Sequence, residues 1–245
     1  MKRRVLNYCF PATHDSFTAL SAIDDPVSIS DFDAFIFDPT SLGNQSLTAF
    51  ERRQTELFDL VHKKGGLILS ILRPNMAVNV AGRTVHAYGL LERVAPAIMK
   101  IFYNSVQAGA GSQVAPVLSA RGPSLAYFQT LKGCLAFVAH LSVSESQVKE
   151  HSGTILAVDS VGYPVAVEFR VAEGLLSFVP IPHNVTGDRT GAAIVKTVAQ
   201  HFNKPTEVTL RLGCLRRPCR ERPFMMNALR SSESRASNLA LRFRV

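Results

Sequence analysis

The sequence contains no tryptophan and only four cysteines, and it has no apolar run approaching the roughly 18 residues that a membrane-spanning helix needs. Its start, Met1 to Arg4, is basic as in a signal peptide. The apolar stretch that follows covers only Val5 to Phe10 and is followed by Pro11, so it is too short for the apolar region of a signal peptide. We therefore expect a cytoplasmic protein that does not bind a membrane.

The motifs that bind common cofactors are also missing. The sequence contains neither G-x-G-x-x-G nor G-x-x-x-x-G-K-[ST], and Gly109-Ala-Gly111 lacks both a third glycine and a preceding strand. No serine stands in a G-x-S-x-G elbow. Cys214-x4-Cys219 could supply two ligands of a metal site, but a zinc site needs about four ligands and the nearest histidine is His201. We expect no cofactor and no metal ion.

Most of the chain carries little net charge, although the formal net charge of the whole sequence is +8. From Lys204 to Val245 there are ten basic and three acidic residues, whereas residues 1–203 hold 17 basic and 16 acidic residues. A nearly neutral body argues against a broad phosphate-binding face. We predict an α/β domain over residues 1–203 and an Arg-rich, disordered or poorly packed tail over residues 204–245. Two origins of this tail stay open: a genuine basic tail, or a frameshifted 3′ end.

A strand, a helix and a second strand follow one another between residues 33 and 72. Asp33–Asp38 and Leu67–Leu72 contain continuous apolar runs, which are typical of strands covered on both faces. Between them, helical spacing of apolar residues predicts a helix from about Ser46 to Lys63, ended by Gly65-Gly66. This order predicts a βαβ unit whose two strands are parallel.

The other elements are less clearly marked. Residues 86–103 have helical spacing interrupted by Pro96, and residues 109–123 are rich in Gly, Ser and Pro and are expected to form a loop. A helix ending near Phe202 is expected to be capped by Thr186 or Asp188. Gly174 predicts a hairpin turn between the last two of the remaining strand candidates, which are Arg4–Phe10, Cys134–Leu141, Thr154–Asp159, Val165–Val171 and Leu175–Pro180.

The order of these elements, together with the block Gly162–Pro180, resembles the class I glutamine amidotransferase-like superfamily. The resemblance covers about two-thirds of residues 1–203. It implies a flavodoxin-like, three-layer α/β sandwich with a mainly parallel central sheet and a C-terminal β-hairpin. Two features of the superfamily's enzymes are absent. Gly133-Cys134-Leu135 has only the first of the two glycines that flank a nucleophile elbow, and it continues as a strand. His183 is followed by Asn184-Val185 where a His-x-Glu pair would stand. The chain therefore resembles a degenerate, non-enzymatic member.

Ligands of open α/β sheets bind beyond the carboxyl ends of the strands. The polar residues expected at these ends, and so in a shared crevice, are His14, Asp15, Asp38, Arg73, Asn75, His183 and Asp188. Each also has a structural explanation: Asp38 opens a turn, Arg73 pairs with Asp38, and His183 lies in a surface loop. The adjacent pair His14-Asp15 would serve as a general base with a carboxylate that orients it.

No complete catalytic set emerges, so the first hypothesis is a non-catalytic ligand-sensing or protein-interaction module, with a protein or a small molecule as partner. The alternative is a hydrolase or amidase that uses the strand-end residues. A weaker alternative is attachment to nucleic acid through the tail. That alternative requires a genuine tail, and the two aromatic residues Phe224 and Phe243 offer little surface for base stacking.

Overall fold

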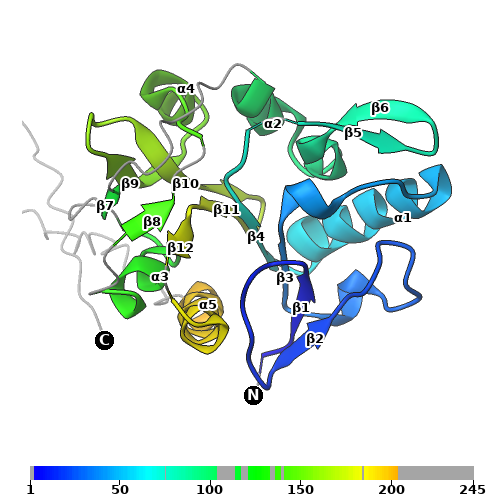
Figure 1. The fold of residues 1–245 in the computed structure, drawn as a ribbon, viewed down its shortest axis with the longest axis horizontal. Helices are drawn as coiled ribbons and strands as arrows, with labels where there is room; N and C mark the ends of the chain where they lie inside the picture. The colour runs from blue at the N-terminus through cyan, green and yellow to red at the C-terminus, as the bar shows by residue number, and fades with distance from the viewer. Residues whose placement is uncertain are drawn as a thin grey trace, which may run out of the picture. The chain divides into compact units, whose positions relative to one another are not determined.

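The computed structural model describes residues 3–74, 76–103, 114–116, 121–132, 136–138, 141–183 and 185–203. The central element of this part of the chain is an eight-stranded sheet with the order β2-β1-β3-β4-β11-β10-β9-β7 (Figure 1). Its strands are β1 (Val5–Tyr8), β2 (Phe17–Ala19), β3 (Ala34–Phe37), β4 (Leu67–Ile71), β7 (Val114–Pro116), β9 (Thr154–Asp159), β10 (Pro164–Val171) and β11 (Gly174–Val179).

Most of this sheet is parallel. The neighbours from β2 through β1, β3 and β4 to β11 pair in parallel, whereas β10, β9 and β7 add three antiparallel pairs at the other side. Strands β3 and β4 are joined by helix α1 (Leu47–Phe58) and pair in parallel, as the spacing of the βαβ unit predicts. The α/β class and the mainly parallel sheet are confirmed.

Helix α1 begins where the sequence predicts, but its last turn differs from the predicted helix. The hydroxyl of Ser46 accepts the Ala49 N–H at 3.0 Å, so Ser46 is the N-cap. After Phe58 the chain continues as a π-helical turn, η3 (Asp59–Lys63). The chain then turns at Gly65, whose φ of +66° lies in the left-handed region that glycine adopts without strain. The predicted stop at this glycine pair is therefore correct, while the last turn is wider than an α-helical turn.

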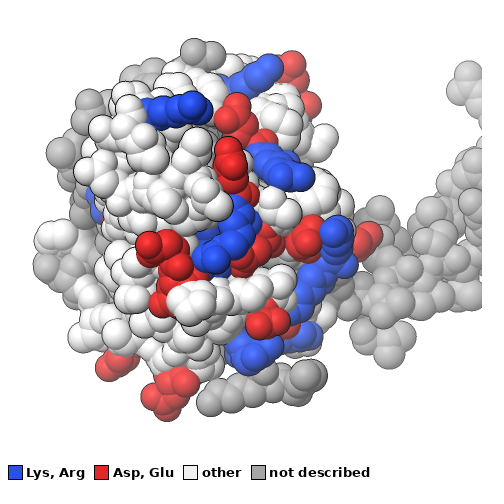
Figure 2. Space-filling view, turned by 90° about the vertical axis from the view of Figure 1, so that its right-hand side faces the viewer, with Lys and Arg blue, Asp and Glu red and all other residues white. Residues whose placement is uncertain are grey.

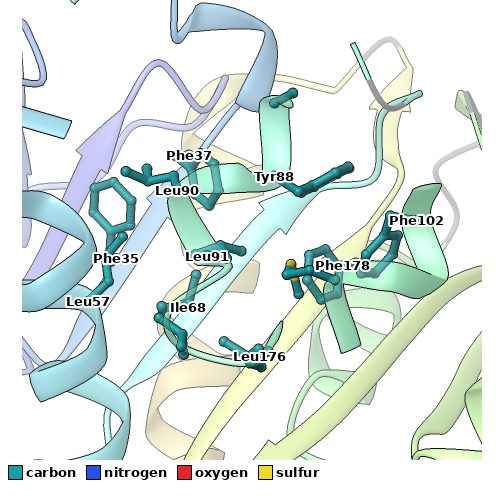
Figure 3. Close-up of a cluster of buried hydrophobic side chains, with 14 of the residues drawn as sticks. Phe35, Phe37, Leu57, Ile68, Tyr88, Leu90, Leu91, Phe102, Leu176 and Phe178 are labelled. Atoms are coloured by element: carbon teal, nitrogen blue, oxygen red, sulfur yellow. The ribbon is translucent and has the colours of Figure 1, made fainter. Parts of the chain in front are cut away.

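Alternate residues of the strands point to opposite faces of the sheet, and both faces are covered (Figure 1). On one face, strand residues such as Phe35, Phe37 and Phe178 pack against α1, the 3₁₀ segment η4 (Ala87–Leu91) and α2 (Pro96–Tyr103), as Figure 3 shows. On the other face, strand residues such as Ile36 and Leu69 pack with residues of α3 (Leu125–Thr130) and α5 (Gly187–Phe202). Burial on both faces explains why β3 is apolar throughout and why β4 is apolar except for the buried Ser70.

Several segments differ from the sequence-based expectation. Pro96 is the first residue of α2, a position where its missing N–H costs nothing, so it starts a helix instead of interrupting one. Strand β7 lies inside the predicted loop of residues 109–123. Two small antiparallel pairs complete the fold: β5 (Ala77–Val80) with β6 (Arg83–His86), and β8 (Ala136–Val138) with β12 (Ile181–His183).

Candidate functional site

Asp38 and Arg73 meet at the carboxyl ends of β3 and β4. Arg73 Nη2 donates to Asp38 Oδ2 at 2.8 Å and Arg73 Nε to Asp38 Oδ1 at 3.4 Å, which makes a two-pronged ion pair. Asp38 Oδ1 also accepts the N–H of Thr40 at 3.0 Å and its hydroxyl at 2.8 Å. Asp38 therefore opens the 3₁₀ turn η2 (Pro39–Ser41) and holds Arg73, as the structural explanation of both residues expects.

Tyr88 of η4 supports this ion pair through the backbone of Arg73. Its side chain is fully buried, and its hydroxyl accepts the Arg73 N–H at 2.7 Å while facing the carbonyl oxygens of Ile71 and Arg73. Burial, as the largest cause, raises the pKa of the Tyr88 phenol, so the group stays protonated. The cluster links β3, β4 and η4 through hydrogen bonds and neutralises its own charges.

A second group of strand-end candidates lies where the loop after β1 meets the start of α5. The hydroxyl of Thr13 donates to Asp188 at 2.5 Å, and the Thr13 N–H donates to the carbonyl of Gly187 at 3.0 Å. The helix approaches so closely that a Cβ on Gly191 would lie 2.0 Å from the Thr13 carbonyl oxygen. The neighbouring His14 ring accepts the Ser16 N–H at Nδ1, 3.1 Å away, so Ser16 orients the imidazole in place of Asp15.

The remaining candidates are placed separately. Asp15 is exposed, and His183 is an exposed residue at the end of β12 that pairs with Ala136. Asn75, the segment around Cys134, and the tail from residue 204 onward lie outside the described residues. Within the described ranges, no three His, Cys, Asp or Glu residues are grouped so that they could hold a metal ion. The candidates therefore form two small clusters and scattered single residues.

A groove of about 790 Å³ lies elsewhere, between the first turn of α4 (Glu145–Glu150) and the turn that joins β9 to β10. We call it the α4 groove. It is lined by Ser142, Val143, Ser144, Glu145, Ser146, Lys149, Val161, Gly162, Tyr163 and Pro164. Its volume is within the range of about 300–1,000 Å³ that is usual for small-molecule sites.

The β9–β10 turn forms one wall of the α4 groove and is held rigidly. Asp159 Oδ1 accepts the N–H groups of Val161 at 2.9 Å and Tyr163 at 2.8 Å, and the Asp159 carbonyl accepts the Gly162 N–H at 3.1 Å. Gly162 has a φ of +99°, which a residue with a side chain adopts only under strain. The turn thus holds the backbone that carries the side chains of Val161 and Tyr163 in place.

These two side chains are unusually exposed. Among the described residues, three large hydrophobic side chains are exposed: Val161 at 75%, Tyr163 at 57% and Met76 at 43%. Two of the three therefore line one groove. Single exposed apolar side chains are common on any surface, whereas exposed apolar side chains that gather around one groove favour an interaction site there.

The opposite wall is polar and electrically balanced. The hydroxyls of Ser144 and Ser146 are 2.8 Å apart, and Lys149 Nζ pairs with Glu145 Oε1 at 2.5 Å. The Val143 N–H donates to the Pro164 carbonyl at 3.0 Å and so ties the two walls together. The groove is an apolar and aromatic surface facing a row of hydroxyls, and the charges of its lining residues cancel.

Charge elsewhere on the body is also balanced. A second pocket of about 540 Å³ on α1 is lined by Thr48, Glu51, Arg52, Gln54, Thr55 and Arg93. Its two arginines are engaged, since Arg52 bonds the Asp25 carbonyl and Arg93 the Thr55 hydroxyl. On the face shown in Figure 2, blue Lys and Arg side chains alternate with red Asp and Glu side chains. This face of the described body offers mixed charge rather than a basic surface for nucleic acid.

Comparisons with known proteins give only distant structural similarity. No family model matches the chain, and no curated protein matches its sequence. A cold-adapted β-galactosidase from Rahnella sp. R3 aligns with a TM-score of 0.46 and 12% identity, over 80% of this chain and 31% of that one. A protein described as a GMP synthase subunit from Thermoplasma acidophilum aligns with a TM-score of 0.41 and 7% identity, over 82% and 96%. A β-galactosidase from Bacillus circulans sp. alkalophilus aligns with a TM-score of 0.39 and 13% identity, over 79% and 26%.

The chain spans less than a third of either β-galactosidase. In addition, none of the described helices combines the length and the apolar character needed to cross a membrane.

Sequence reasoning overlooked the α4 groove because it looked for charged residues at strand ends. The pattern that would have revealed it is Val161-Gly162-Tyr163, in which large apolar residues flank the glycine of a turn. Turn tips are normally polar, so apolar residues there have no packing explanation in the sequence. Gly162 itself indicates a turn between two strand candidates.

Proposed function

We propose that this chain is a non-catalytic α/β module that binds a small-molecule ligand or a protein partner in the α4 groove. Its architecture is that of an amidotransferase-like, flavodoxin-like three-layer sandwich with a C-terminal hairpin formed by β10 and β11, in a member that lacks the superfamily's catalytic elbow and His-x-Glu pair. The observation that carries the proposal is the exposure of Val161 and Tyr163 on a rigid turn that lines the groove.

The hydrogen bonds made by the strand-end residues support a structural role rather than catalysis. Asp38, Arg73 and Asp188 all take part in hydrogen bonds that hold structural elements together. A general base or nucleophile needs an adjacent reacting group within hydrogen-bond reach and an approach for substrate. The described pockets, however, are lined by other residues than these.

The rigidity of the groove favours binding. Exposed apolar side chains on a mobile loop lose conformational entropy when a partner is bound, whereas a turn already fixed by three hydrogen bonds has little to lose. Burying the two exposed side chains would supply hydrophobic free energy of roughly 25 cal/mol for each Å² of apolar surface removed from water.

The test is a screen of metabolites and a random peptide library against the full chain, with thermal shift and ligand-observed NMR as readouts. Each hit is then measured with the double variant Val161→Ser/Tyr163→Ser and with Met76→Ser, which removes an exposed hydrophobic side chain outside the groove. We expect hits whose binding is lost in the double variant and kept in Met76→Ser. Turnover of any substrate that disappears in Asp38→Ala, Arg73→Ala or His183→Ala, without unfolding, would overturn the proposal in favour of a hydrolase.

A further inference from the structure

We infer that the ligand of the α4 groove is a neutral, polyhydroxylated molecule of the saccharide class, which rests on the proposed function because it names the ligand of that same groove. Three features of the groove carry the inference: its balanced charge, its paired hydroxyls and an exposed aromatic ring on a hydrogen-bonded turn.

The charge of the groove favours a neutral ligand over a strongly ionic one. Its charged lining residues are Glu145 and Lys149, and these neutralise each other through an ion pair of 2.5 Å on one helix turn. Both side chains are more than half exposed, so the pair adds polar groups without adding a net field. A phosphate or carboxylate ligand would meet a carboxylate beside the single ammonium group of the lining. A neutral ligand can accept hydrogen bonds from Lys149 and donate them to Glu145 together.

The serine hydroxyls match the hydrogen-bonding character of sugar hydroxyls. A hydroxyl donates one hydrogen bond and accepts two, and each sugar hydroxyl does the same. Ser144 and Ser146 share one hydrogen bond at 2.8 Å, which uses the proton of one of them. The other proton and the unused lone pairs are accessible to a ligand, since both groups are exposed. The pair can therefore bind adjacent hydroxyls of one ring.

Tyr163 supplies the apolar contact that a sugar ring needs. The faces of a sugar ring carry C–H groups, which are attracted to the negative face of an aromatic ring. Tyr163 is 57% exposed and its backbone N–H is fixed by Asp159 at 2.8 Å, so the backbone that carries the ring is positioned relative to the serines before any ligand arrives. Val161 extends this apolar surface on the same turn.

An extended peptide fits the groove less well. A peptide that adds to a strand needs unpaired backbone groups along its track. Here the N–H groups of Val143, Val161, Gly162 and Tyr163 all have backbone or carboxylate partners. A peptide would therefore have to bind mainly through side chains.

The experiment uses the full chain on an array of neutral mono-, di- and oligosaccharides, followed by calorimetric titration with each free saccharide that binds. The variants are Tyr163→Ala, Tyr163→Phe and Ser144→Ala/Ser146→Ala, with Met76→Ala as the matched control. We expect Tyr163→Ala to weaken binding by at least about tenfold, which corresponds to about 1.4 kcal/mol. The double serine variant should also lose affinity, while Tyr163→Phe and Met76→Ala should bind as the wild type does. Urea unfolding of each variant confirms that it is folded.

The outcomes separate this inference from the proposed function. If no saccharide binds in a Tyr163-dependent manner but a library peptide does, the saccharide inference is wrong and the interaction module stands. If a metabolite of another class binds through the groove, the saccharide inference is wrong and the proposed function stands. If no saccharide, other metabolite or peptide binds through the groove, both are wrong. Saccharide binding that is unchanged in Tyr163→Ala and in the serine variant would also overturn the inference.

Discussion

Replacing Asp38 with alanine distinguishes a structural clamp from a catalytic residue. In the structure this carboxylate receives four hydrogen bonds, two from Thr40 and two from Arg73, and joins the ends of β3 and β4. If it were part of an active site, its loss would abolish activity and leave folding intact. If it is a clamp, the loss appears as reduced stability.

The expected magnitude follows from the number and exposure of these bonds. A hydrogen bond to a charged group contributes about 1.5–3 kcal/mol. The side chains of Arg73 and Asp38 are 20% and 10% exposed, so solvent screens part of the ion pair. The bond from Arg73 Nε is also long, at 3.4 Å. We therefore expect Asp38→Ala to lower the free energy of unfolding by about 3 kcal/mol, within the range for breaking a partly buried pair. For a domain of this size that corresponds to a fall in Tm of about 6–12 °C.

The assay is urea unfolding followed by circular dichroism, with the exposed Asp15→Ala as a matched control that should change stability by less than about 0.5 kcal/mol. A wild-type midpoint for Asp38→Ala would refute the clamp. Stability equal to wild type together with loss of a measured turnover would place Asp38 in an active site.

Three further predictions concern the scaffold. Arg53 is fully buried and donates to three backbone carbonyls and a carboxylate. Arg53→Ala should therefore lower the free energy of unfolding, measured with urea, by about 3–5 kcal/mol. The exposed neighbour variant Arg52→Ala should lower it by less than about 1 kcal/mol. Gly191→Ala should destabilise the protein by about 1–3 kcal/mol despite the higher helix propensity of alanine, because the new Cβ meets a backbone oxygen at 2.0 Å. Gly43→Ala, at an open position, should not destabilise it. Equal urea midpoints for Gly191→Ala and the wild type would contradict the close approach. Burial raises the pKa of the Glu168 carboxyl, so its contribution to stability is fully present below the unfolded pKa and is lost as pH rises through the folded pKa. The stability of Glu168→Gln relative to the wild type should therefore increase as pH rises from acid to neutral. A difference in the free energy of unfolding that does not change with pH would refute this.

The parts of the fold that the sequence predicts are those with strong local periodicity. Strands β3 and β4 are buried on both faces, so their sequences are apolar apart from Ser70 in β4. Helix α1 between them has one apolar face. Their parallel pairing then follows from the short crossover. The same reasoning could not reveal β7, a three-residue strand in a segment rich in Gly, Ser and Pro, because its pairing with β9 depends on a partner about 40 residues away.

The candidate site was harder to predict than the fold. The pairing of Asp38 with Arg73 followed from neighbouring parallel strand ends, and it is observed. The involvement of Asp188 with Thr13 could not be foreseen, because it depends on how closely α5 approaches the loop after β1. The α4 groove requires the position of α4 against the β9–β10 turn, which results from the packing of Val148 and Phe169 near Gly153. Tertiary packing of this kind leaves no periodic pattern in the sequence.

The most direct test of the account is the binding of screened ligands and saccharides to the full chain compared with Val161→Ser/Tyr163→Ser, measured as the shift in Tm at saturating ligand. The account predicts at least one ligand that raises the Tm of the wild type and of Met76→Ser but not that of the double variant. A ligand that raises all three equally, and whose binding is instead lost in a folded Arg73→Ala variant, would show that the site lies at the strand ends and would contradict the account.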